Sequence, residues 1–117
     1  MRSQVLEEDK PTVRNIAQGL YTKWQIDRPK SLERILDSLS LRTVTRSYND
    51  TEMKVDTGST VIEVTTYQDR IILHSIQLKD LEKSIDAEEV FKLREYKSKK
   101  SYINDFTESW YEAVNPS

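Results

Sequence analysis

The sequence predicts a small α+β domain with two N-terminal helices, a four-stranded antiparallel meander, and one or two C-terminal helices packed on one sheet face. The N-terminal and C-terminal thirds of the chain place apolar residues at helical spacing, whereas the middle alternates polar and apolar residues between short turns. With 117 residues, the chain is long enough for one hydrophobic core and short for two. We therefore expect a single domain over residues 1–117.

Residues 11–40 are predicted to form a helical pair, preceded by a frayed stretch over residues 1–10. Pro11 suits the first turn of the first helix, because its fixed φ and missing N–H cost least there. The second helix is expected to begin at Pro29 or Ser31. Each helix would bury one apolar stripe, formed by Val13, Ile16, Ala17, Leu20 and Trp24 in the first and by Leu32, Ile35, Leu36 and Leu39 in the second.

Residues 41–79 are predicted to form the antiparallel sheet. Four segments that alternate in polarity or are rich in β-branched residues are separated by turns at Asn49-Asp50, at Gly58 and at Gln68-Asp69. Strands that follow one another through such short turns pair antiparallel. A four-stranded meander is the simplest sheet that satisfies this pattern.

The last predicted strand, residues 70–78, carries apolar residues on both faces if its side chains alternate strictly. We therefore expect it to be covered on both faces, or to be buried in part by a partner chain. The two sets would be Ile71 and Leu73 on one face and Ile72, Ile76 and Leu78 on the other. The sheet face without helices is expected to be open, and it would carry Val61, Thr65 and Tyr67.

Residues 84–114 are predicted to form a C-terminal helix or helix pair. Asp86, Glu88 and Glu89 are acids of the kind that stabilise a helix N-terminus. The polar stretch 97–101 interrupts the apolar stripe, and whether it also breaks the helix stays open. Beyond it, apolar side chains return at helical spacing, at Ile103, Phe106, Trp110 and Val114.

The composition excludes several classes of site. The chain has no cysteine, one histidine and two glycines. Disulfide scaffolds, thiolate zinc sites, multi-histidine metal sites and glycine-rich phosphate loops are excluded as a result, and we predict no catalytic residue, no metal and no cofactor. The one histidine, His74, is expected to be structural, because no suitable nucleophile lies near it in the sequence.

The charge and the terminal sequence bear on localisation and partners. No apolar run is long enough to cross a membrane, and the N-terminal residues lack the apolar stretch of a secretory signal. We therefore expect a cytoplasmic protein with no membrane partner. The net charge of −2 argues against a dedicated binder of duplex DNA.

The string Asp56-Thr57-Gly58-Ser59 is similar to the Asp-Thr-Gly-Ser/Thr signature of aspartic proteases, in which two aspartates share a proton. The resemblance implies a homodimeric protease that takes one aspartate from each copy. No glycine follows Gly58, so the glycine-rich flap and the later Gly-Arg pair of that family are absent. We favour a hairpin turn in which Gly58 adopts a positive φ.

Residues 92–102 combine five basic residues, one acid and two tyrosines. Cations of this kind can hold the backbone of single-stranded nucleic acid while its bases stack on the rings. The favoured interpretation is a solvated helix face with ion pairs such as Glu95 with Lys99. In the nucleic-acid alternative, the binding residues would be Tyr96, Lys97, Lys99, Lys100 and Tyr102.

Aromatic residues gather near the C-terminus. Trp110 and Tyr111 are adjacent and project about 100° apart on a helix, so we expect one of them to leave the core. Exposed aromatic side chains often anchor protein interfaces. The interface candidates are Tyr67, Tyr102, Trp110 and Tyr111.

These observations favour a non-enzymatic protein–protein interaction module, such as an adaptor, a small chaperone, an inhibitor or a regulatory protein. It would act through the open sheet face and the aromatic C-terminal helix. A homodimer is one way to cover such surfaces. The alternative hypothesis is single-stranded nucleic-acid binding through residues 92–102.

Overall fold

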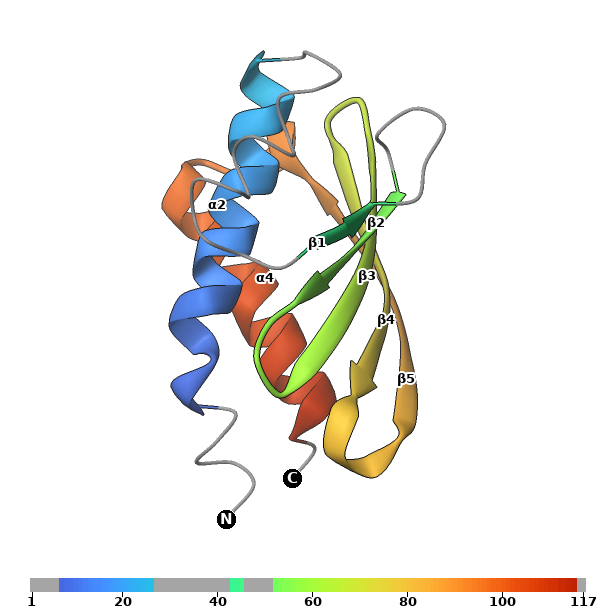
Figure 1. Ribbon diagram of the computed structural model, residues 1–117. Coiled ribbons are helices and arrows are strands. Elements are labelled where there is room, and N and C mark those ends of the chain that lie inside the picture. Colours follow the sequence, from blue (N-terminus) through green and yellow to red (C-terminus); the bar gives the residue numbers. More distant parts are fainter. Residues whose placement is uncertain (1–6, 27–42, 46–51, 116–117) are drawn as a thin grey trace.

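Five strands form one antiparallel sheet in the order in which they occur in the chain, and the two described helices lie together on one of its faces (Figure 1). The computed structural model describes residues 7–26, 43–45 and 52–115. The predicted α+β arrangement is thereby confirmed. Its elements are helices α2 (Lys10–Ile26) and α4 (Lys99–Val114), strands β1 (Thr43–Thr45), β2 (Glu52–Asp56), β3 (Thr60–Tyr67), β4 (Arg70–Leu78) and β5 (Lys83–Lys92), and 3-10 turns η1 (Lys79–Leu81) and η2 (Leu93–Glu95).

Helix α2 confirms the first predicted helix, with Pro11 in its first turn. The second predicted helix lies outside the described residues. Residues 7–10, which we expected to fray, are held in place, because the Asp9 carboxylate binds Ser59 in the turn between β2 and β3. The predicted stripe of α2 is buried at Val13, Ile16, Ala17 and Leu20.

The predicted strands appear as β1 to β4. The first of them is described only over Thr43–Thr45, where it pairs with β2. Each successive pair is antiparallel, with Lys54 of β2 opposite Glu63 of β3 as one example. The predicted meander is therefore present, and a fifth strand extends it.

A β-bulge at His74 corrects the expectation that β4 is apolar on both faces. Glu63 pairs with Ser75, whereas the next residue of β3 pairs with Leu73, so His74 is the extra residue. The extra residue reverses the alternation of side chains along the strand. The buried apolar residues of β4 all face the helices as a result: Ile71, Leu73 and Ile76. Ile72 lies on the opposite face, where it is half-buried.

The predicted C-terminal helix is wrong over residues 84–98: residues 84–92 belong to strand β5, residues 93–95 form η2, and α4 begins only at Lys99. The ladder with β4 supplies backbone hydrogen bonds to a segment whose local pattern favoured a helix, and such pairing overrides local preference. Phe91 is buried between the exposed Val90 and Lys92, as the alternation of a strand requires. The acids that we assigned to a helix start lie instead on an edge strand, where charge discourages further strand pairing: Asp86, Glu88 and Glu89.

Helix α4 begins at Lys99, and this position answers the question left open about residues 97–101. Ser98 is the N-cap, and its hydroxyl oxygen accepts a hydrogen bond from the Ser101 backbone N–H at 3.1 Å. The polar stretch is therefore the start of one helix and not a break within a longer one.

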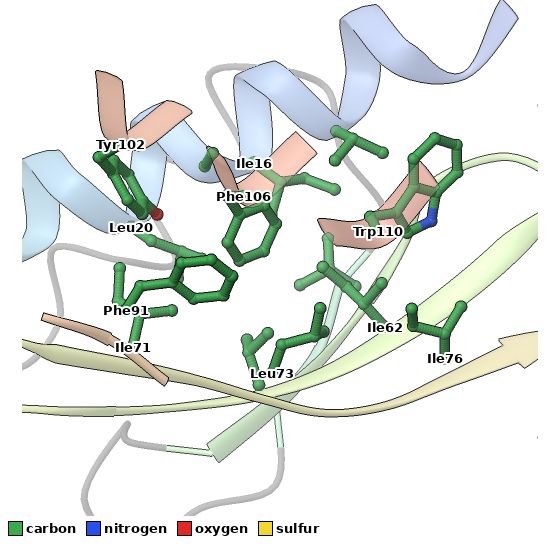
Figure 2. Close-up of a cluster of buried hydrophobic side chains, with 14 of the residues drawn as sticks. Ile16, Leu20, Ile62, Ile71, Leu73, Ile76, Phe91, Tyr102, Phe106 and Trp110 are labelled. Carbon is green, nitrogen blue, oxygen red and sulfur yellow. The ribbon is translucent and has the colours of Figure 1, made fainter. Parts of the chain in front are cut away.

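The core lies between the helices and the covered face of the sheet (Figure 2). Tyr102 is central to its aromatic part, because four other rings have centroids within 6.2 Å of its own: Tyr21, Phe91, Tyr96 and Phe106. The largest fully buried side chains are Trp110, Tyr102, Phe106, Ile16, Leu20, Ile62, Ile71, Leu73, Ile76 and Leu93.

Two tyrosines, Tyr96 and Tyr102, make the stability of the fold decrease at alkaline pH. Burial raises the pKa of Tyr102 well above its ordinary value, and burial together with the hydrogen bond to Asp105 raises the pKa of Tyr96. In the unfolded chain both hydroxyls ionise near about pH 10. Above that pH the unfolded chain has lost protons that the folded chain keeps, so the free energy of unfolding falls as the pH rises.

We expect urea unfolding at a series of alkaline pH values to show this fall, and Tyr96→Phe to make it less steep, because the variant removes one of the two hydroxyls. All other side chains are common to both proteins, so the difference between the two slopes isolates the Tyr96 hydroxyl. Equal slopes in the wild type and the variant would contradict the assignment.

Candidate functional site

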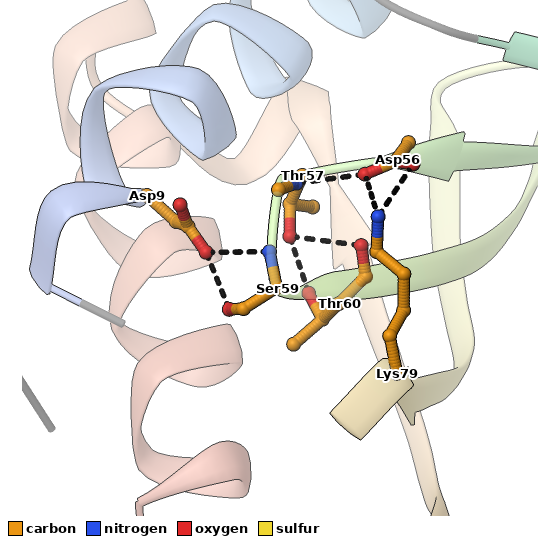
Figure 3. A network of polar contacts seen from close by, with 7 residues as sticks. Asp9, Asp56, Thr57, Ser59, Thr60 and Lys79 are labelled. Carbon is orange, nitrogen blue, oxygen red and sulfur yellow. Dashed lines mark hydrogen bonds and ion pairs between the residues drawn. The ribbon is translucent and has the colours of Figure 1, made fainter. Parts of the chain in front are cut away.

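The Asp56-Thr57-Gly58-Ser59 string forms the hairpin turn between β2 and β3, as the favoured interpretation predicts (Figure 3). Gly58 has a φ of 120°. Asp56 Oδ1 accepts a hydrogen bond from the Gly58 N–H at 2.8 Å. Lys79 Nζ donates to both oxygens of the same carboxylate, at 2.9 and 2.7 Å. The Asp56 carboxylate thus closes the turn and ties it to η1.

A second carboxylate fixes the same turn from the N-terminal side (Figure 3). Asp9 Oδ2 accepts hydrogen bonds from the Ser59 N–H, at 2.9 Å, and from the Ser59 hydroxyl. From α4, Trp110 Nε1 donates to Thr60 Oγ1 at 3.0 Å. Each aspartate therefore has its own partners within the fold, and we assign this motif a structural role.

The structure places the interface candidates in different surroundings. Tyr67 is 59% exposed, whereas Tyr102 and Trp110 are 0% exposed because α4 directs them into the core. Tyr111 is half-buried, with Lys10 Nζ 4.0 Å from its ring centroid. The candidate protein interface therefore depends on the sheet around Tyr67 and not on the aromatic residues of α4.

The nucleic-acid candidates are likewise separated. Lys97, just before α4, and Lys99 and Lys100, in its first turn, are exposed, but the Tyr102 ring is buried in the core. Tyr96 is half-buried, and its hydroxyl donates to Asp105 at 2.5 Å. The two tyrosines thus offer less stacking surface than the sequence pattern predicted.

The open face is the side of the sheet that no described helix covers. An apolar row crosses β3 to β5, because Thr65 of β3 pairs with Ile72 of β4, and Ile72 pairs with Val90 of β5. On β2 the same row continues with the exposed Glu52, which pairs with Thr65. Val90 is 49% exposed. Sequence reasoning missed this row, since it placed residue 90 in a helix. The open face comprises Glu52, Lys54, Val61, Glu63, Thr65, Tyr67, Arg70, Ile72, His74, Ser75, Gln77, Ser84, Asp86, Val90 and Lys92.

Charges of opposite sign lie on the two sides of the apolar row. Arg70 and Lys92 are paired neighbours on one side. Glu63 and Asp86 lie on the other side, separated by one residue of β4. Lys54 Nζ lies 3.8 Å from the Glu63 carboxylate and offsets part of its charge. The open face thus has a basic pair on one side of the apolar row and two acids on the other side, and the uncharged row of Val61, Gln77 and Ser84 lies beyond the acids.

His74 connects three strands on the open face. Its Nε2 lies 2.7 Å from Thr65 Oγ1, and its Nδ1 lies 3.4 Å from a Glu88 carboxylate oxygen. This order of hydroxyl, imidazole and carboxylate also occurs in nucleophilic triads. The sequence did not indicate that Thr65 contacts His74, because the two residues lie on different strands. None of these residues lines the cleft described next, and we assign their contacts to holding the bulge against β3 and β5.

A cleft of about 720 Å³ opens at the end of the sheet where β3 turns into β4. Three segments line it: the last turn of α2, the turn between β3 and β4, and η2. Sequence reasoning missed it, because these segments are far apart in the chain and no motif marks them. The lining residues are Lys23, Trp24, Gln25, Thr66, Tyr67, Gln68, Asp69 and Arg94.

Comparisons of this chain with protein-family models, with curated proteins and with solved structures find no match. Within residues 7–26, 43–45 and 52–115, no helix has the length and apolar character needed to cross a membrane. The same residues contain no group of three or more His, Asp or Glu side chains placed to hold a metal ion. The candidate functional surfaces of the described residues are the open face and the cleft.

Proposed function

We propose that the protein is a non-enzymatic interaction module, of adaptor or regulatory type, that binds protein through its open face. The observation that carries this proposal is the exposed apolar surface on that face. Val90 and Tyr67 are 49% and 59% exposed, and Ile72 lies beside Val90. A partner that removes these groups from water gains free energy by doing so.

The partner that we assign is a second copy of this chain. A two-fold axis that runs across the strands, along the Thr65–Ile72–Val90 row, stacks the two apolar rows on each other. The same rotation places the basic pair of one open face over the two acids of the other. Arg70 and Lys92 of one copy would then lie near Glu63 and Asp86 of its partner. A face with this charge order is self-complementary, as a two-fold interface requires.

Pairing through the edge of β5 is a weaker explanation for self-association. The strand carries charged residues along most of its length, and Glu88 interrupts its extended backbone with a φ of 49°. Both features discourage the addition of another strand. The sheet face, and not the sheet edge, is therefore the surface that we assign to the partner.

Sedimentation equilibrium over a concentration series tests the proposal. We expect the wild type to approach twice its monomer mass and Val90→Lys to remain a monomer, because the lysine places a charge in the apolar row. Leu81→Lys is the matched control, since Leu81 is 45% exposed but lies in η1, outside the open face. A wild type that stays monomeric, or equal dissociation of both variants, would overturn the proposal.

A charge exchange tests the assigned orientation. Arg70→Glu is expected to weaken the dimer, because it places two acids opposite each other across the interface. Adding Asp86→Lys to that variant is expected to restore the dimer, because the opposite-sign pair is re-formed with the signs exchanged. A double variant weaker than Arg70→Glu alone would contradict this orientation.

A further inference from the structure

The cleft contains cationic, aromatic and hydrogen-bonding groups within one volume. Lys23 and Arg94 line it from two different elements, and Trp24 and Tyr67 add two aromatic rings. Its volume of about 720 Å³ is within the range of small-molecule sites, which is about 300–1,000 Å³. Asp69 is the one acid among the lining residues, so the described lining has a net positive charge.

The cleft also contains a polar group without a partner. Thr66 is 3% exposed, and its hydroxyl makes no hydrogen bond to any described residue. Buried polar groups in folded proteins are nearly always hydrogen-bonded, so an exception that lines a cleft points to a missing partner. A polar group of a bound ligand would satisfy this hydroxyl.

Trp24 is held in place by contacts that connect it to the core. Its ring makes a T-shaped contact with the Tyr21 ring at a centroid distance of 5.3 Å, and Tyr21 stacks on Tyr102 at 5.7 Å. Tyr102 is fully buried, so this chain of rings anchors the wall of the cleft. A fixed aromatic wall favours ligands with a flat ring, because little conformational entropy is lost on stacking.

Further cations follow the cleft residues along the chain. Arg70 pairs with Lys92 across β4 and β5, and the exposed Lys99 and Lys100 occupy the first turn of α4. Positive side chains in a first turn oppose the helix dipole, and that turn contains no acid. A bound anion would offset this unfavourable arrangement.

We propose that the cleft binds single-stranded nucleic acid, with a base stacked on Trp24 and the neighbouring phosphates held by Lys23 and Arg94. The lysines at the start of α4 would extend the cationic track along the strand. Each component has a matching group in a nucleotide chain: a flat base, an anionic backbone and polar base edges. The proposed site shares Tyr67, Arg70 and Lys92 with the open face. Lys23, Trp24 and Arg94 are not part of that face, so variants at these three residues test the cleft and leave the open-face dimer unchanged.

Fluorescence anisotropy with a short labelled oligouridylate and a labelled oligothymidylate, at low salt, tests this site in the full chain. We expect binding that weakens steeply as salt is added, because phosphate contacts release counterions. Trp24→Ala is expected to weaken binding about tenfold or more. Arg94→Glu is expected to have a similar effect, and it replaces an exposed residue that the core does not need.

Lys83→Glu is the charge-matched control. It changes the net charge as Arg94→Glu does, but Lys83 lies at the opposite end of the sheet, beside η1 (Figure 1). We expect Lys83→Glu to bind almost as the wild type does. Equal weakening by the two reversals, or no binding by the wild type at low salt, would overturn the proposal. Displacement of the oligonucleotide by uridine monophosphate at similar concentration would also overturn it, since the site would then hold a single nucleotide and not a strand.

Discussion

Replacing Trp110 with alanine is expected to lower the free energy of unfolding by about 3–5 kcal/mol, the usual cost of removing a large aromatic side chain from a core. Trp110 is 0% exposed and lies between α4 and the sheet (Figure 2). Its Nε1–H also donates to Thr60 Oγ1, so the variant removes a hydrogen bond together with the packing. Urea unfolding followed by far-ultraviolet circular dichroism measures the change.

Two further variants make the result interpretable. Glu112→Ala changes an exposed residue of the same helix and is expected to alter stability by less than about 0.5 kcal/mol. Trp110→Phe keeps much of the apolar volume but removes the donor to Thr60, and it should fall between the wild type and Trp110→Ala. A loss below about 1 kcal/mol for Trp110→Ala would contradict the placement of this side chain in the core.

The sequence predicted the strands and helices whose local and tertiary signals agree. The stripe of α2 and the β-branched strands β2 to β4 had a local pattern that matched their final environment. Segment 84–92 shows the opposite case. Its acids and the spacing of Val90 and Leu93 fit a helix, yet the free edge of β4 makes it a strand. Edge pairing of this kind is not encoded in the local pattern.

The bulge at His74 is a second feature that the sequence did not predict. Strict alternation divided the apolar residues of β4 between two faces, and one extra residue places Ile71 and Ile76 on the same side. No glycine marks this bulge in the sequence, and its partner irregularity on β5 is the positive φ of Glu88. The face without described helices therefore carries fewer apolar residues of β4 than the pattern implied, because Ile72 lies on it and Ile76 does not.

The sequence predicted some residues of the candidate sites and not others. Tyr67 was identified because it follows the outward alternation of β3. Trp24 was assigned to the core stripe of the first helix, although it also lines the cleft. The other cleft residues come from segments that only the tertiary fold brings together, so no spacing within one segment could reveal them. The lysines of the basic segment 92–102 are exposed as a nucleic-acid site would require, but Tyr102, the ring on which a base was expected to stack, is buried.

Replacing Gly58 with alanine is expected to lower the free energy of unfolding by about 1–3 kcal/mol, because its φ of 120° is a conformation that residues with a Cβ rarely adopt. The added Cβ would also lie 2.5 Å from Asp9 Oδ1. The variant would therefore displace the carboxylate that binds Ser59 and weaken the contact between the start of α2 and the β2–β3 turn. Urea unfolding again measures the effect.

A double-mutant cycle with Asp9→Ala separates the backbone strain from the steric clash. Alone, Asp9→Ala removes charge-assisted hydrogen bonds to Ser59 and is expected to cost about 1.5–3 kcal/mol. In the Gly58→Ala background it should cost less, because the methyl group has already displaced the carboxylate and its removal relieves the clash. Losses that add within about 0.5 kcal/mol would show that the two residues are not coupled, and that Gly58 is required only for its backbone conformation.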